Sequence, residues 1–162
     1  MPAPISPAPV TQYRPDVLPP YISNGVMGIR LASLPHLPGT TMVSGFAGLD
    51  PNDGVEGFAR APYALATDIR LDGVWASRAS GQIQFRQQRY DFSTGEVATA
   101  WTFRVGDATA RVETVAFCSR TVPALAVCRT SVRVNRPADV ALAAGVDPTA
   151  VIARLLVDAF IR

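Results

Sequence analysis

The sequence predicts an all-β protein, an antiparallel β-sandwich, followed by one C-terminal helix. Between Gly25 and Val134, apolar side chains recur mostly at every second residue. This is the period of a strand that buries one of its faces. Short turns containing glycine and aspartate separate these stretches, as in strands that follow one another in an antiparallel sheet. With 162 residues, of which 48% are apolar, the chain is expected to form one domain with a core.

Three successive strands form the predicted centre of this fold. They cover about residues 97–105, 110–117 and 125–134, and a fourth strand is expected to precede them at Gln82–Phe92. In the first of the three, Trp101 is in phase with Val97 and Phe103, which predicts that Trp101 lies in the core. The strands are close together in the sequence, so we expect them to form a meander.

The two cysteines are expected to be free thiols. Cys118 and Cys128 fall on two strands of a predicted hairpin around Ser119–Pro123, with Cys118 opposite about residue 124 and Cys128 opposite about residue 114. This register separates them by four residues, or roughly 13 Å along the strand. A disulfide requires Cα atoms within roughly 7 Å. Free thiols indicate a reducing compartment, and we expect a cytoplasmic location.

The two ends of the chain differ from its centre. Residues 1–20 are rich in proline and alanine without the pattern of a signal peptide, which predicts a disordered arm. At the other end, Asp147 and Pro148 form a good helix start, and a helix is predicted over Pro148–Ile161. Its polar residues share one face and its apolar residues another: Arg154, Asp158 and Arg162 against Val151, Ile152, Leu155, Leu156 and Phe160.

Four stretches carry a resemblance to a known family. In chain order they are YISNGVMGIR from Tyr21, VSGFAG from Val43, DIRLDG from Asp68 and RYDFSTGEV from Arg89. In this order and spacing they resemble the N-terminal β-sandwich domain of glycoside hydrolase family 65, over about residues 21–147. The family includes inverting phosphorylases of maltose, trehalose and kojibiose, and hydrolases such as acid trehalase. The residues that match the family's opening have structural roles in this interpretation (a turn, a close backbone approach and an arginine that pairs within the domain): Asn24, Gly25, Gly28 and Arg30.

The resemblance implies a sandwich of the large galactose mutarotase-like type, incomplete here because the family's sandwich is longer than the whole chain. We therefore expect a truncated module, with residues 148–162 not native to the fold. In the relatives, the general acid and the phosphate-binding residues lie in a later (α/α) barrel. No catalytic residue can be carried over to this sequence, and the chain alone is expected to be inactive.

The resemblance also implies the partners. They are the chain's own barrel, an α-glucoside disaccharide bound through the parent enzyme, and a second copy in a full-length homodimer. No cofactor is implied, apart from inorganic phosphate as co-substrate if the parent is a phosphorylase.

The region Phe46–Ala64 is predicted to be a long loop, because it is dense in Gly, Pro, Asp and Asn and has no period. The family's sandwich sends a loop toward the active site, and this region is the best candidate by position and composition. Its aromatic and charged residues fit a sugar, whose faces stack on aromatic rings and whose hydroxyls bind charged groups. A mere connection is the more common role of such a loop. The candidate substrate-binding residues are Glu56, Phe58, Arg60, Tyr63 and, outside the loop at a strand end, Trp75.

Other chemistry is poorly supported by the sequence. His36 is the only histidine and lies in a proline-bounded turn, so a solvated role is more common than a catalytic one. The acidic run from Asp50 begins like a calcium loop but has Val55 and Ala61 where an EF-hand needs glycine and glutamate. All 15 basic residues are arginines, but they are scattered, so we expect no nucleic-acid partner. No apolar stretch reaches the ~20 residues of a membrane span, so no membrane partner is expected.

Two functions therefore remain open. In the first, the chain is the non-catalytic N-terminal module of an enzyme similar to family 65. In the second, it is a stand-alone carbohydrate-binding or protein-interaction module.

Overall fold

The structure, a computed structural model, describes residues 20–34, 36–49 and 54–149. In this part of the chain every pairing between strands is antiparallel, which confirms the predicted all-β class. The elements are β1 (Tyr21–Ser23), β2 (Met27–Arg30), β3 (Thr40–Leu49), β4 (Glu56–Ala61), β5 (Tyr63–Leu71), β6 (Val74–Trp75), the 3₁₀ turns η1 (Ala76–Arg78) and η2 (Ser80–Gln82), β7 (Ile83–Asp91), β8 (Glu96–Val105), β9 (Ala108–Cys118), β10 (Ala126–Val134) and β11 (Val140–Asp147).

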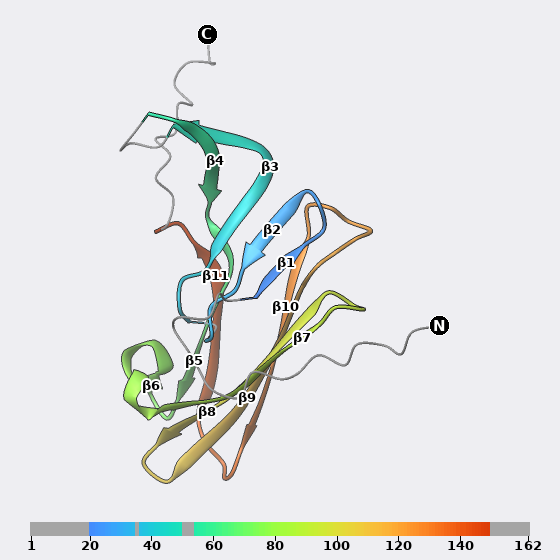
Figure 1. Cartoon of the computed structure of the whole chain (residues 1–162). Helices are drawn as coiled ribbons and strands as arrows, with labels where there is room; N and C mark the ends of the chain where they lie inside the picture. Colours follow the sequence, from blue (N-terminus) through green and yellow to red (C-terminus); the bar gives the residue numbers. More distant parts are fainter. Residues whose placement is uncertain (1–19, 35, 50–53, 150–162) are drawn as a thin grey trace.

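The strands form three sheets arranged as a sandwich. One layer is the sheet β10-β9-β8-β7. Its inner face is covered by two smaller sheets, β1-β2-β3-β4 toward one end and β11-β5-β6 toward the other (Figure 1). The hairpin β3–β4 lies at one end of the molecule and β6 lies at the other (Figure 1).

The large sheet is the predicted meander. Strands β7 to β10 follow one another with close to the expected bounds, and the side chains of β8 and β9 alternate between buried and more accessible positions. Trp101 is only 3% exposed, which confirms its predicted place in the core. Polar side chains occupy the outer positions of β9, where Arg111 and Glu113 are exposed.

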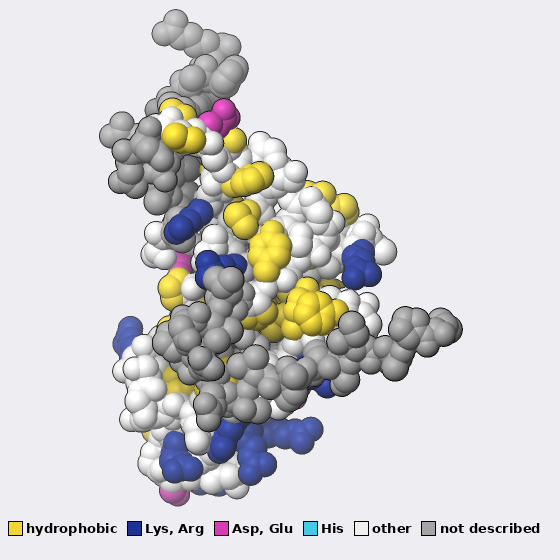
Figure 2. Space-filling view, viewed as in Figure 1, with side chains coloured by type: hydrophobic (Ala, Val, Ile, Leu, Met, Phe, Trp, Pro, Cys, Tyr) yellow, Lys and Arg dark blue, Asp and Glu magenta, His cyan; other side chains and the backbone are white. Residues whose placement is uncertain are grey.

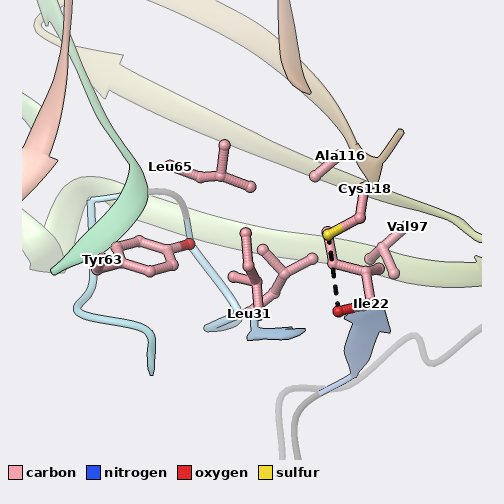
Figure 3. Close-up of a cluster of buried hydrophobic side chains, with 8 residues drawn as sticks. Ile22, Leu31, Tyr63, Leu65, Val97, Ala116 and Cys118 are labelled. Atoms are coloured by element: carbon pink, nitrogen blue, oxygen red, sulfur yellow. Dashed lines mark hydrogen bonds between the residues drawn. The ribbon is translucent and has the colours of Figure 1, made fainter. Parts of the chain in front are cut away.

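The core consists of two clusters between the layers. The first joins β1 and β2 to β5, β8 and β9 (Figure 3), and its buried members are Ile22, Ile29, Leu31, Tyr63, Leu65, Val97, Ala116 and Cys118. The second joins β5 and η1 to β8 and β9, and its buried members are Ile69, Leu71, Ala76, Trp101, Phe103, Ala108, Ala110 and Val112. Strands β5, β8 and β9 contribute to both clusters and so connect the two ends of the sandwich.

Both cysteines are free, as predicted, but the predicted register of their hairpin is wrong by two residues. Cys118 pairs with Ala126 and Cys128 pairs with Ala116. The connection is longer than the expected turn because Ser119 and Leu125 are joined by a backbone hydrogen bond that closes it. Burial raises the pKa of both thiols. The Cys118 thiol donates to the carbonyl oxygen of Ile22 over 3.8 Å (Figure 3).

The predicted long loop at Phe46–Ala64 is wrong for most of its length. The described residues there form the end of β3, the whole of β4 and the start of β5. The pairing of β3 with β4 shifts register between Met42 and Ala47, at a bulge that contains Gly45 with φ 80°. This irregularity and the glycines hide the two-residue period in the sequence, because bulged residues leave the alternation.

The predicted N-terminal arm and the predicted C-terminal helix lie outside the described residues, except for Pro20, Pro148 and Thr149. At the boundary, the Oδ1 atom of Asp147 accepts hydrogen bonds from the backbone N–H and the hydroxyl of Thr149, at 2.9 and 2.7 Å.

Candidate functional site

The outer part of the hairpin β3–β4 brings three of the five predicted site residues together. Glu56, Phe58 and Arg60 alternate along β4, so their side chains share one face, and all three are exposed. Phe58 is 78% exposed and pairs with Ala47, while Glu56 pairs with Leu49, itself 73% exposed. The face therefore combines apolar and charged groups.

The opposite face of the same hairpin has small residues where the two strands pair. Gly48 pairs with Gly57, and a Cβ added at Gly48 would be 3.4 Å from the Cβ of Ala59. These small residues leave the outer hairpin with little packing of its own. Figure 2 shows hydrophobic side chains on the surface over this end of the molecule.

Tyr63 does not belong to this group. Its side chain is only 2% exposed and packs in the first core cluster against Leu31 and Leu65 (Figure 3). Burial raises its pKa from 10.0 to about 12, with a smaller contribution from Cys128. Pro62 separates β4 from β5 and is the signal that sequence reasoning missed, since a residue without an N–H often ends a ladder. The chain changes sheets there, and Tyr63 enters the core.

Trp75 is also separate from the hairpin. It lies on β6, at the other end of the molecule, paired with Arg70 of β5 (Figure 1). The Arg70 guanidinium lies 5.7 Å from the centre of the Trp75 ring and forms a 3.1 Å ion pair with Asp139. Trp75 is more accessible than Trp101, being partly rather than fully buried. One of its faces is nevertheless occupied by Arg70, an arrangement typical of a cation–π contact.

The charged residues of the DIRLDG stretch hold the turns at this end of the sandwich. Asp68 accepts a 2.6 Å hydrogen bond from the Ser77 hydroxyl, which fixes η1 against β5. Asp72 has φ 45° and accepts a 2.7 Å hydrogen bond from Arg136. Arg136 also donates to Asp107 at 2.8 Å, so it joins the β5–β6 and β8–β9 turns to the segment before β11. This network was not predicted from the sequence.

The opening stretch is also structural, as predicted. The Oδ1 atom of Asn24 accepts from the backbone N–H groups of Val26 and Met27, and Gly25 has φ 90°. The Asn24 amide group then donates to the carbonyl oxygens of Ser119 and Pro123, at 2.7 and 2.9 Å. This single side chain therefore shapes the β1–β2 turn and ties it to the β9–β10 connection.

Gly28 shows the predicted close approach, since an added Cβ would overlap the hydroxyl end of Tyr21. The predicted pairing of Arg30, an exposed residue, stays a prediction.

His36 is not the solvated residue that its turn predicts. It is half-buried, and its ring meets Trp101 edge-on at 6.2 Å between centroids. Burial lowers its pKa, and nearby Asp68 opposes this effect. Among the described residues, its Nδ1 atom has no hydrogen-bond partner. The contact with a core tryptophan indicates a packing role.

The described residues contain neither of two other kinds of feature. Across residues 20–34, 36–49 and 54–149, no group of three or more His, Cys, Asp or Glu side chains is arranged to hold a metal ion. The same part of the chain contains no helix with the length and hydrophobicity of a membrane span.

The comparison with known proteins agrees with the geometry. Residues 20–153 match the family described as glycosyl hydrolase family 65, N-terminal domain. No curated protein matches the sequence. The matched residues contain the whole described sandwich, from β1 to β11.

Proposed function

Because the chain belongs to the N-terminal domain family of glycosyl hydrolase family 65, we propose that it is a non-catalytic module that supports the (α/α) barrel of an enzyme acting on α-glucosides. The charged residues of the stretches DIRLDG and RYDFSTGEV support this proposal. Asp68, Asp72 and Asp91 bind turns of the domain itself, which is the role of structural residues. The three glutamates lie on three different strands, β4, β8 and β9.

The outer hairpin β3–β4 is the surface that we assign to the barrel. It carries Phe58 and Leu49, which are 78% and 73% exposed, on one face, and Phe46 at 46% on the other, with Val55 at 61% just before β4. Exposed apolar side chains gathered at one place mark interaction sites more often than chance exposure does. Glu56 and Arg60 flank Phe58 on the same face and provide polar contacts at the rim of such an interface. This cluster of exposed apolar residues is the observation that carries the proposal.

A titration of the chain with a separately produced family 65 barrel tests this assignment. The Phe58→Asp variant should bind the barrel at least about tenfold more weakly, because losing an aromatic anchor at the centre of an interface costs about 2 kcal/mol or more. The matched control is Phe92→Asp, since Phe92 is 68% exposed but lies in the turn after β7. Equal binding of both variants would show that the hairpin is not part of the interface with the barrel.

The second candidate function, a carbohydrate-binding module, is favoured by the same face. An exposed aromatic ring between Glu56 and Arg60 offers a sugar one stacking surface and two charged groups. Titration of the chain alone with maltose and trehalose, followed by protein NMR shifts on β4, distinguishes the two functions. Saturable shifts at Phe58 would favour sugar binding, whereas the barrel-supporting function predicts none.

A further inference from the structure

The outer face of the sheet β10-β9-β8-β7 brings together arginines that are far apart in the sequence. Arg104, Arg111 and Arg133 lie on the neighbouring strands β8, β9 and β10, and all three are exposed. Arg133 pairs with Arg111, and Arg111 pairs with Thr102 of β8, so their side chains share one face of the sheet. Arg104 comes two residues after Thr102 and is therefore a diagonal neighbour of Arg111. These three residues form the arginine cluster.

The charge of the arginine cluster is not neutralised by an ion pair. Within the described part of the chain, none of its guanidinium groups forms an ion pair or a hydrogen bond. Asp107, in the turn after β8, is already paired with Arg136 at 2.8 Å. Glu113 is exposed on the same face of β9 but pairs across the sheet with Ser131. The cluster is thus a concentrated positive surface that attracts anions.

The pairing of Arg111 with Arg133 is unfavourable for the free chain. Like charges directly opposite each other on neighbouring strands are destabilising. Violations of such packing and charge rules are expected at functional sites, where a ligand compensates for them. The arrangement therefore indicates a surface that binds an anionic group.

A hollow lies beside the arginine cluster on the same face of the sheet. It has a volume of about 410 Å³, and its polar groups come from Gln82, Gln84, Thr102 and Arg104. Gln84 pairs with Thr102, which places the hollow over β7 and β8. Small-molecule sites usually measure ~300–1,000 Å³. Amide and hydroxyl groups both donate and accept hydrogen bonds, so these side chains suit a ligand that carries several hydroxyls.

We propose that the hollow and the arginine cluster together bind a phosphorylated sugar. A phosphate monoester carries a charge of about −1.5 to −2 at pH 7 and has three strong acceptor oxygens. Arginine matches phosphate with two parallel N–H···O hydrogen bonds. Arg104, which belongs to both the hollow and the cluster, holds the phosphate together with Arg111, while the sugar hydroxyls contact Gln84 and Thr102. The site is separate from hairpin β3–β4 and does not depend on the barrel-supporting function.

Titration of the purified chain with glucose 6-phosphate, followed by protein NMR shifts on β7 and β8, tests the proposal. We expect saturable binding at least about tenfold tighter than that of glucose or of inorganic phosphate, because only the sugar phosphate engages both parts of the site. The absence of saturation at millimolar concentrations would overturn the proposal. Equal binding of inorganic phosphate would show an anion site without a sugar subsite, and equal binding of glucuronate would overturn the choice of phosphate over carboxylate.

Arg104→Gln tests the residue that connects the two parts of the site. This variant should bind glucose 6-phosphate at least about tenfold more weakly, because it loses charge-assisted hydrogen bonds to the phosphate. The matched control is Arg89→Gln, an exposed arginine on β7 that pairs with Ala98 on the same face but outside the cluster. Equal weakening in both variants would show that only the net charge of the chain matters and would overturn the site.

Arg133→Gln distinguishes a binding role from a structural one. The variant should weaken the binding of glucose 6-phosphate and, in the absence of ligand, raise the urea concentration at the unfolding midpoint, because it removes one of two opposed like charges. This gain in the midpoint should shrink at high salt, where the repulsion is screened. A lower midpoint would show that Arg133 stabilises the fold, and would overturn the interpretation of the cluster as a binding surface.

Discussion

At the scale of single residues, Gly39 and Gly28 each lie against a tyrosine side chain, but adding a Cβ at the two positions should destabilise the fold to different degrees. A Cβ at Gly39 would overlap the ring of Tyr63 and would be 2.6 Å from the carbonyl oxygen of Arg30. Tyr63 is 2% exposed, so it has no room to move. A Cβ at Gly28 instead meets the end of Tyr21, which is 44% exposed and free to swing outward.

We therefore predict that Gly39→Ala lowers the free energy of unfolding by about 1–3 kcal/mol, the usual cost of overpacking a core. Gly28→Ala should cost clearly less, and Tyr21→Ala should recover most of that loss. Urea unfolding followed by circular dichroism measures all three variants. Equal losses of unfolding free energy in Gly39→Ala and Gly28→Ala would show that the Tyr63 ring moves aside as easily as the Tyr21 ring.

Tyr63 also predicts a pH dependence. Its pKa is raised from 10.0 to about 12 in the folded chain, so the unfolded chain loses this proton first as the pH rises. Stability from this group is complete below pH 10 and falls between pH 10 and 12 by up to ~3 kcal/mol. In the Tyr63→Phe variant, the urea concentration at the unfolding midpoint should change less between pH 10 and pH 12 than in the original chain. Tyr21→Phe should leave this pH dependence as it is. A Tyr63→Phe profile as steep as the original would contradict the assignment.

At the scale of elements, the β1–β2 turn depends on Asn24. This side chain makes hydrogen bonds within its own turn and with the connection that follows β9. Asn24→Ala should therefore cost about 1–3 kcal/mol of unfolding free energy, because several polar backbone groups lose their partner together. Ser23→Ala is the control, since Ser23 makes a single exposed hydrogen bond with Gly25. A loss at Asn24 no larger than at Ser23 would show that water replaces these bonds.

The sequence predicts the regular elements well and the interrupted ones poorly. Strands β8 and β9 alternate between buried and more accessible positions, so period alone identifies them. The sequence does not predict hairpin β3–β4, because its outer part has no buried face that would give a two-residue period, and because a bulge interrupts the pairing. The register that pairs the strands of Cys118 and Cys128 depends on the length of the connection between β9 and β10. That length is set by the backbone hydrogen bond at the base of the connection, which the sequence pattern does not reveal.

The sequence predicts only part of the candidate site, and the reason is similar. Glu56, Phe58 and Arg60 lie on one strand, where their spacing in the sequence keeps them together. Tyr63 is only three residues further, but the change of sheet at Pro62 moves it into the core. The contact between Arg70 and Trp75 depends on strand pairing, and the network around Arg136 joins residues far apart in the chain. Local patterns carry no information about such contacts.

At the scale of the whole molecule, the two ends of the sandwich differ in the side chains that they expose. The outer hairpin β3–β4 presents Phe58 and Leu49 at one end, where we place the catalytic barrel. Basic side chains are visible toward the opposite end of the face shown in Figure 2. A groove between β10 and β11 is a separate feature, lined mainly by residues of β5, β10 and β11.

The measurement that tests the central claim most directly is mass spectrometry of the native protein, recovered from the cells that make it with an antibody against β7–β10. A supporting module predicts that peptides of a family 65 (α/α) barrel are recovered with the chain in about equal amounts, on the same polypeptide or bound to it. Recovery of a 17.2 kDa chain without any barrel would contradict the account, and carbohydrate binding would become the leading function.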